Sequence, residues 1–132
     1  MREIKFRGKR LDNGEWVYGY YFSSDEMPKR GEVGHFIKCG LNEEFRIIPE
    51  TVGQFTERKD KNEVEVYDED IVKVQHEIYH QIIGRVSFED GQWIVTESDG
   101  EKWNLYWLFW TSIEVIGNMF DNPELLENPL CS

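Results

Sequence analysis

The chain has 132 residues and a net charge of -11, from 15 Lys and Arg against 26 Asp and Glu, which fits one acidic domain of ordinary size. Eight Phe, six Tyr and five Trp exclude intrinsic disorder, the short apolar runs exclude a membrane span, and two cysteines are too few for a disulfide framework. We therefore expect a soluble, cytoplasmic protein with no cofactor and no membrane partner.

Valine and isoleucine number 21, against seven leucines and no alanine, and this composition favours strands over helices. Apolar runs and alternation predict nine strands, at residues 3–9, 15–22, 34–38, 46–48, 52–55, 70–74, 82–88, 92–96 and 113–117. Hairpin turns are predicted at Asn13-Gly14, Asp90-Gly91 and Asp99-Gly100, because these dipeptides tolerate the positive φ of a two-residue turn.

The C-terminal region carries the clearest helix signal. Asn122 can cap a helix, Pro123 suits its first position, and Leu125 with Leu126 supplies an apolar face. Pro129 disfavours helix at the residue before it, so we predict a short helical tail at residues 122–128. Residues 25–31 and 58–63, which are rich in charged residues, are predicted to be exposed loops.

Three stretches of the chain form a recognisable combination. They are residues 2–8 (Arg-Glu-Ile-Lys-Phe-Arg-Gly), residues 51–72 with the segments Thr-Val-Gly-Gln-Phe-Thr, Lys-Asp-Lys-Asn and Val-Tyr-Asp-Glu-Asp-Ile-Val, and residues 114–126, which open with Glu-Val-Ile-Gly-Asn and close with Asn-Pro-Glu-Leu-Leu. Together they resemble the YopX family, small proteins of phages and prophages of Gram-positive bacteria. That family often has glycine where this chain has Glu63 and Glu69. The resemblance implies a mostly β protein with a small barrel, no assigned molecular function and no catalytic residues.

We predict a single YopX-like domain over residues 1–132, with an N-terminal β part at about residues 1–56, a barrel-like part at about 64–118 and the helical tail at 122–128. The predicted fold class is mainly β. The succession of strands and turns between residues 70 and 117 is typical of a small SH3-like barrel. We expect an N-terminal β-hairpin extension before this barrel and a short C-terminal helix after it. Barrels of this kind are commonly binding scaffolds, on which function resides in particular sites.

The segment from His76 to His80 reads His-Glu-Ile-Tyr-His, an H-E-x-x-H pattern. On a helix, His76 and His80 would share one face and bind zinc, and Glu77 would act as general base. The segment lies between two predicted strands, however, and residues four apart on an extended strand are about 13 Å apart, too far for one ion. We therefore predict no metal site and no catalytic residue, and keep a zinc hydrolase as an alternative.

Trp103, Trp107 and Trp110, together with Tyr106, make a dense aromatic segment. In a helix the three tryptophans would share one stripe, and in a strand Trp103 and Trp107 would alternate onto one face. Core packing is the expected role, because a small domain needs this apolar area. A subunit interface or a recognition surface is the alternative.

Lys5, Arg7 and Lys9 alternate with uncharged residues, so one face of the first strand is basic. Residues 1–30 hold seven Lys or Arg and five Asp or Glu, whereas residues 31–132 hold eight and 21. The overall charge repels phosphates at long range, so this face is expected to pair with acidic groups of its own chain or of another subunit. We expect weak or no binding to DNA.

Three hypotheses for function follow. The favoured one is a non-enzymatic accessory protein of a phage or prophage, a binding or assembly module that forms a homo-oligomer and binds a phage or host macromolecule that the sequence does not identify. The second is a nucleic-acid-related module, which contacts DNA through Arg2, Lys5, Arg7, Lys9 and Arg10 or mimics it through its acidic remainder. The third is the zinc hydrolase. The candidate binding surface comprises Lys5, Arg7, Lys9, Trp103, Trp107 and Trp110.

Overall fold

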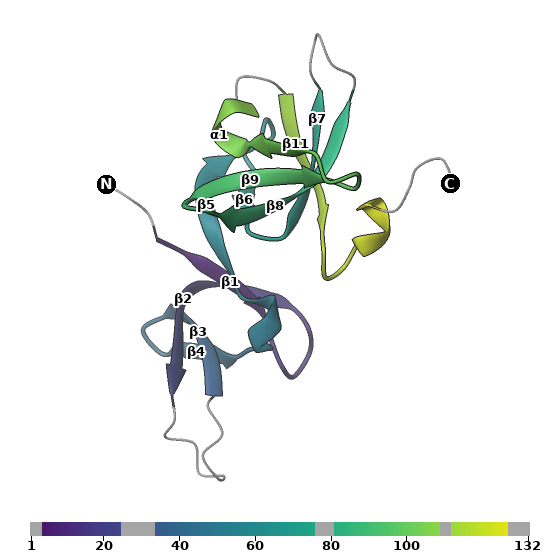
Figure 1. Ribbon diagram of the computed structural model, residues 1–132. Helices are drawn as coiled ribbons and strands as arrows, with labels where there is room; N and C mark the ends of the chain where they lie inside the picture. The colour runs from purple at the N-terminus through teal and green to yellow at the C-terminus, as the bar shows by residue number, and fades with distance from the viewer. Residues whose placement is uncertain (1–3, 25–33, 76–80, 109–111, 127–132) are drawn as a thin grey trace. The chain divides into compact units, whose positions relative to one another are not determined.

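A computed structural model describes residues 4–24, 34–75, 81–108 and 112–126 of the chain (Figure 1). The prediction of a mainly β protein is confirmed, because the described residues are dominated by two antiparallel sheets. The chain divides into two compact units, residues 1–55 (the N-terminal unit) and residues 56–132 (the C-terminal unit). None of the described helices is long and apolar enough to cross a membrane.

The N-terminal unit is built on the first five strands of an antiparallel sheet with the order β4-β3-β2-β1-β5-β6, in which β6 (Glu65–Tyr67) belongs to the C-terminal unit. Its strands are β1 (Phe6–Lys9), β2 (Trp16–Ser24), β3 (Gly34–Gly40), β4 (Glu43–Arg46) and β5 (Gly53–Lys59), and the 3-10 turn η1 (Pro49–Thr51) precedes β5. β5 continues past residue 55 into the C-terminal unit. The hairpin predicted at Asn13-Gly14 is confirmed, because β1 pairs with β2 on either side of it.

Two glycines allow the N-terminal sheet to pack closely. A Cβ at Gly8 would lie 2.8 Å from Cδ1 of Ile47, a side chain that is buried. A Cβ at Gly19 would collide with the main-chain carbonyl oxygen of Lys38 on the neighbouring strand. A side chain at Gly19 would therefore force β2 and β3 apart, and one at Gly8 would displace the buried Ile47 side chain.

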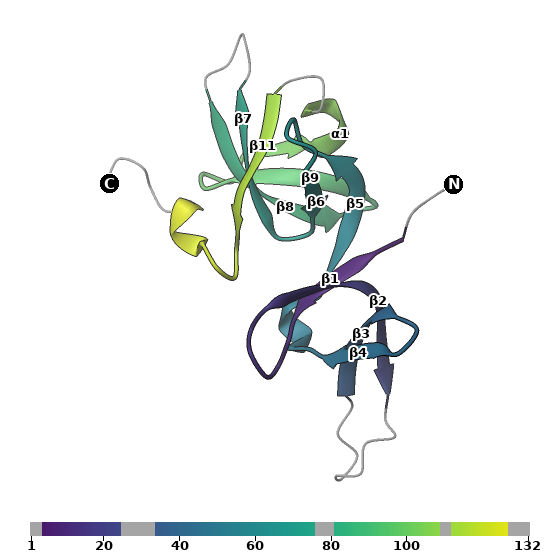
Figure 2. The same cartoon turned by 180° about the vertical axis from the view of Figure 1, so that it is seen from behind.

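The C-terminal unit contains a second antiparallel sheet, with the order β10-β9-β8-β7-β11. Its strands are β7 (Asp70–Gln75), β8 (Ile82–Glu89), β9 (Gln92–Glu97), β10 (Lys102–Asn104) and β11 (Ser112–Asn118). β6 (Glu65–Tyr67) precedes β7, α1 (Leu105–Leu108) follows β10, and the 3-10 turn η2 (Pro123–Leu126) follows β11. Figure 2 shows β11 beside its partner β7. The two other predicted hairpins are confirmed by the pairing of β8 with β9 and of β9 with β10.

One apolar cluster forms the core of the C-terminal unit. It consists of Val66, Val72, Val74, Ile82, Val86, Trp93, Val95, Leu105, Leu108 and Ile113. The predicted SH3-like barrel is not confirmed, because the sheet of the described residues is open, with β10 and β11 at its two ends. The chain after β10 forms α1, which contributes two buried leucines to the core.

A buried carboxylate connects the segment after β5 to β11. Asp60 is 5% exposed; its Oδ1 accepts hydrogen bonds from the N–H groups of Asn62 (2.8 Å) and Val64 (3.0 Å), and its Oδ2 accepts one from Val115 (2.8 Å). The prediction of an exposed loop at residues 58–63 is therefore wrong at Asp60, which is buried, and at residues 58 and 59, which belong to strand β5. The reason is that backbone N–H groups inside a folded segment need acceptors, and this carboxylate accepts hydrogen bonds from three of these N–H groups.

Local sequence signals missed or misplaced several other elements. β6, β10 and α1 were not predicted, and the strand expected at residues 46–48 lies at Glu43–Arg46. Within the described residues, the predicted helical tail is the four-residue 3-10 turn η2. Asn122 lies directly before this turn, and its Oδ1 accepts a hydrogen bond from the N–H of Asn118 (3.3 Å), upstream of the turn. The loop predicted at residues 25–31 lies outside the described residues.

Glu63 and Glu69 both have left-handed backbones, with φ of 64° and 71°. This conformation costs a residue with a Cβ about 1–2 kcal/mol, and glycine avoids that cost. The ion pair between Glu69 and Arg85, at 3.9 Å on the surface, is too weak to offset it. We expect Glu63→Gly and Glu69→Gly each to raise the free energy of unfolding by about 0.5–1 kcal/mol in urea denaturation.

The matched control is Glu114→Gly, in the middle of strand β11. That change is expected to lower the free energy of unfolding, because glycine weakens a strand interior. A loss of stability in both turn variants would contradict the account of these two turns.

Candidate functional site

The H-E-x-x-H segment and Trp110 lie outside the described residues, so the expectations for His76, Glu77, His80 and Trp110 stay predictions. Within the described ranges, no group of three or more His, Cys, Asp or Glu side chains is arranged to hold a metal ion.

The other two tryptophans of the aromatic segment have separate environments. Trp103, on β10, packs against the core cluster and donates a hydrogen bond from Nε1 to Glu97 Oε2 (2.8 Å). Trp107, on α1, is 61% exposed. The helix covers only four residues and directs Leu105 and Leu108 into the core, so the predicted single tryptophan stripe does not form across Trp103 and Trp107. Core packing is confirmed for Trp103, whereas Trp107 is a surface residue.

The register of the N-terminal sheet collects basic and aromatic side chains on one face, which we name the basic–aromatic face. Directly paired residues of antiparallel strands project to the same side, as do alternate residues along a strand. The pairs Arg7↔Tyr18, Tyr20↔Lys38 and Phe36↔Arg46 define the face. It comprises Lys5, Arg7 and Lys9 from the β1 segment, Trp16, Tyr18, Tyr20 and Phe22 from β2, Phe36 and Lys38 from β3, and Glu44 and Arg46 from β4.

The cations of the β1 segment lie against aromatic rings. Lys5 Nζ is 5.4 Å from the centroid of the Phe55 ring, and the Arg7 guanidinium and Lys9 Nζ are 4.5 and 5.5 Å from that of Trp16. These distances are those of cation–π contacts. Arg7 is only 6% exposed, so the basic strand predicted from the sequence is in part a packed layer of cations and rings.

The part of the face on β2, β3 and β4 is more open. The Tyr20 side chain is 69% exposed and pairs across the strands with Lys38. Phe22 and Phe36 stack at 5.2 Å between ring centroids with an interplanar angle of 16°, and Arg46 follows Phe36 in the same row. Sequence reasoning found the cations of β1 but missed this half. The available signal was the aromatic alternation at residues 16, 18, 20 and 22.

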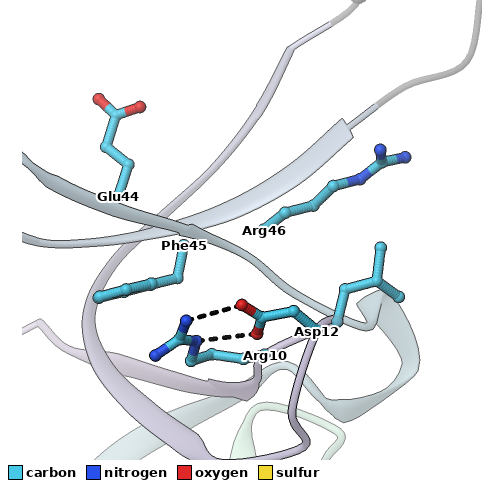
Figure 3. Close-up of a pocket in the computed structure, with 6 residues that line it drawn as sticks. Arg10, Asp12, Glu44, Phe45 and Arg46 are labelled. Atoms are coloured by element: carbon cyan, nitrogen blue, oxygen red, sulfur yellow. Dashed lines mark hydrogen bonds and ion pairs between the residues drawn. The ribbon is translucent and has the colours of Figure 1, made fainter.

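A cavity of about 480 Å³ adjoins β4 in the same unit, lined by Arg10, Leu11, Asp12, Glu44, Phe45 and Arg46 (Figure 3). Arg10 donates two hydrogen bonds to Asp12, at 3.0 and 2.7 Å, and its guanidinium lies 4.3 Å from the Phe45 ring centroid. In Figure 3 the side chains of Glu44 and Arg46 extend away from this pair. The hydrogen bonds from Arg10 lower the pKa of the Asp12 carboxyl, and Asp12 raises the pKa of Arg10.

A smaller cavity of about 170 Å³ lies in the C-terminal unit, along β9 and β10. Its polar lining pairs internally: Lys102 Nζ donates to Glu89 Oε1 (3.0 Å) and Asn104 Nδ2 to Gln92 Oε1 (2.8 Å). The hydrogen bond from Lys102 is the main reason that the pKa of Glu89 is lowered. These groups satisfy one another, which suits a structural role better than ligand binding.

The two units differ in charge. Residues 1–55 contain nine Lys or Arg and nine Asp or Glu, whereas residues 56–132 contain six and 17. The net negative charge therefore belongs to the C-terminal unit, and the N-terminal unit, which carries the basic–aromatic face, is neutral overall.

Comparison with known proteins identifies the fold. The family model described as YopX protein matches residues 5–127 of the chain. Among solved structures, the chain is similar to the X-ray crystal structure of protein YopX from Bacillus subtilis, with 21% sequence identity and a TM-score of 0.55. That similarity covers 94% of this chain and 96% of the other. Among curated proteins there is no match.

The ion pair beside the larger cavity gives a pH-dependent prediction. Because Arg10 depresses the folded-state pKa of Asp12, the pair contributes stability above the ordinary Asp pKa and loses it as the pH falls through the folded-state value. We expect Arg10→Gln to return the Asp12 carboxyl to the ordinary Asp range, as followed by carboxyl NMR during acid titration.

The Glu89 carboxyl is the internal control, because its pKa depends on Lys102 and Ser87 and should not change in the Arg10→Gln protein. An unchanged Asp12 titration in that variant would show that Arg10 does not control this carboxyl.

Proposed function

The chain belongs to the YopX family, and from this premise we propose that it is a non-enzymatic binding module of a phage or prophage. It acts in the bacterial cytoplasm and holds an anionic macromolecule on its basic–aromatic face. The observation that carries the proposal is the exposed ring of Tyr20 beside Lys38, continued by the stacked Phe22 and Phe36.

Exposed rings beside cations are features of recognition surfaces. Aromatic residues and arginine are enriched where proteins bind partners, and an exposed aromatic patch gains free energy when a partner covers it. The half of the face on β2 to β4 carries two cations, Lys38 and Arg46, and one carboxylate, Glu44. A negatively charged partner matches this local charge.

The overall charge of -11 is compatible with such a partner at physiological salt. The Debye length there is about 8 Å, so a bound anion responds mainly to charges within that distance. The excess acidic residues belong to the C-terminal unit, and the N-terminal unit is neutral. The expectation of weak binding to DNA was based on the charge of the whole chain. The neutral charge of the N-terminal unit is more favourable to an anionic partner than that overall charge.

Inorganic polyphosphate tests the proposal, because it offers negative charge without bases or protein side chains. We expect the full chain to bind it in calorimetry at low salt and Lys38→Glu to weaken binding by about ten-fold, through loss of a phosphate contact and reversal of the local charge.

Lys59→Glu is the matched control. It makes the same charge change on an exposed lysine of the C-terminal unit and is expected to leave the affinity within about two-fold. Absence of binding, or equal losses in the two variants, would overturn the proposal.

We also propose that copies of the chain associate through the exposed Trp107 on α1, since exposed aromatic rings favour homo-oligomer interfaces. Light scattering at micromolar concentrations should then give a mass above the 15.8 kDa of one chain. Trp107→Glu should lower this mass, because it places a charge in the interface. A mass of one chain over the whole range would contradict self-association.

A further inference from the structure

We infer that the anionic partner of the basic–aromatic face is a single-stranded nucleic acid. This inference rests on the function proposed above and specifies the chemistry of the partner. Polyanions in general require only the cations of the face. The inference therefore depends on the aromatic side chains and on how they are spaced relative to Lys38 and Arg46.

The rings form a platform on which bases can stack. Tyr20 and Phe22 are alternate residues of β2 on the same face, so their positions are about 6.7 Å apart along the strand. The ring of Phe36, on β3, stacks on the ring of Phe22, so the aromatic surface continues from β2 onto β3. Stacking of bases on aromatic side chains is a common mode of binding single strands and tolerates any sequence.

The ring spacing distinguishes a single strand from a duplex. Successive nucleotides of one duplex strand rise by about 3.4 Å, which is half the distance between the Tyr20 and Phe22 positions. A duplex also keeps its bases stacked on one another and presents only their edges in the grooves. An extended single strand can separate its bases to match the rings.

Each ring position has a cation in the same cross-strand row. Lys38 is paired with Tyr20, and Arg46 is paired with Phe36. Neighbouring strands are about 4.8 Å apart, so a base over a ring would leave its phosphate within reach of the adjacent cation. Glu44 ends the Tyr20 row on β4, and its negative charge directs the phosphates towards β3 and the Arg46 row.

Fluorescence anisotropy with the full chain and a labelled oligothymidine of about 12 nucleotides tests this inference. We expect Tyr20→Ala to weaken binding by about ten-fold and Tyr20→Phe to keep most of the affinity, because phenylalanine retains the ring. Lys38→Gln should weaken binding and reduce its dependence on salt. A parallel titration with oligouridine shows whether the chain prefers DNA or RNA. Preference for either single strand supports the inference.

Phe88→Ala is the matched control, since Phe88 on β8 is also a largely exposed ring but lies in the C-terminal unit. It is expected to leave oligonucleotide affinity unchanged. Tyr20→Ala is expected to weaken polyphosphate binding much less than oligothymidine binding, which separates ring stacking from charge. A thermal unfolding profile like that of the parent chain verifies that each variant is folded.

The outcomes separate this inference from the proposed function. If Tyr20→Ala binds oligothymidine like the parent chain, or if duplex DNA binds as tightly as the single strand, the inference is overturned. A retained effect of Lys38→Glu on polyphosphate would then leave the proposed function standing and point to an acidic protein surface. If neither polyphosphate nor oligonucleotides bind, both fail.

Discussion

The close approach of β2 to β3 at Gly19 is the constraint on which the candidate surface depends. A Cβ at Gly19 would meet the carbonyl oxygen of Lys38, so glycine allows the pair Tyr20↔Lys38 to form directly beside it. From this pair, the two-residue period of the strands places Phe22 beside Phe36 on the same face and turns Ile37 into the buried side. The exposure of Tyr20 and the burial of Ile37 therefore have one structural cause.

Aromatic rings serve two purposes on this face. Along the β1 segment, Trp16 and Phe55 lie against Lys5, Arg7 and Lys9 and help to cover the stems of these cations. Towards β3 the face is more open, because Tyr20 is mostly exposed, although Phe22 and Phe36 are half-buried. One alternating pattern thus supplies packing at one end of the sheet and a candidate recognition surface at the other.

The sequence determined the local features of this fold better than the pairings between distant residues. Asn13-Gly14 and Asp90-Gly91 identified their hairpins because these dipeptides tolerate positive φ, which Gly14, Asp90 and Gly91 adopt. The two-residue turn is confirmed at Asp90-Gly91, whereas the loop around Gly14 is longer. The role of Asp60 could not be predicted, since its bond to Val115 joins residues 55 positions apart. The binding half of the face was missed for the same reason: β2 and β3 are separated by a long connection, and their register decides which cation lies beside which ring.

The central claim is that the partner lies on the basic–aromatic face of the N-terminal unit. The most direct measurement is an amide NMR map of the full chain titrated with oligothymidine. The account predicts that the largest shifts fall at Tyr20, Phe36 and Lys38 and that residues 103–108 are nearly unaffected. Shifts centred on Trp103 and Trp107, with none on β2 and β3, would contradict it.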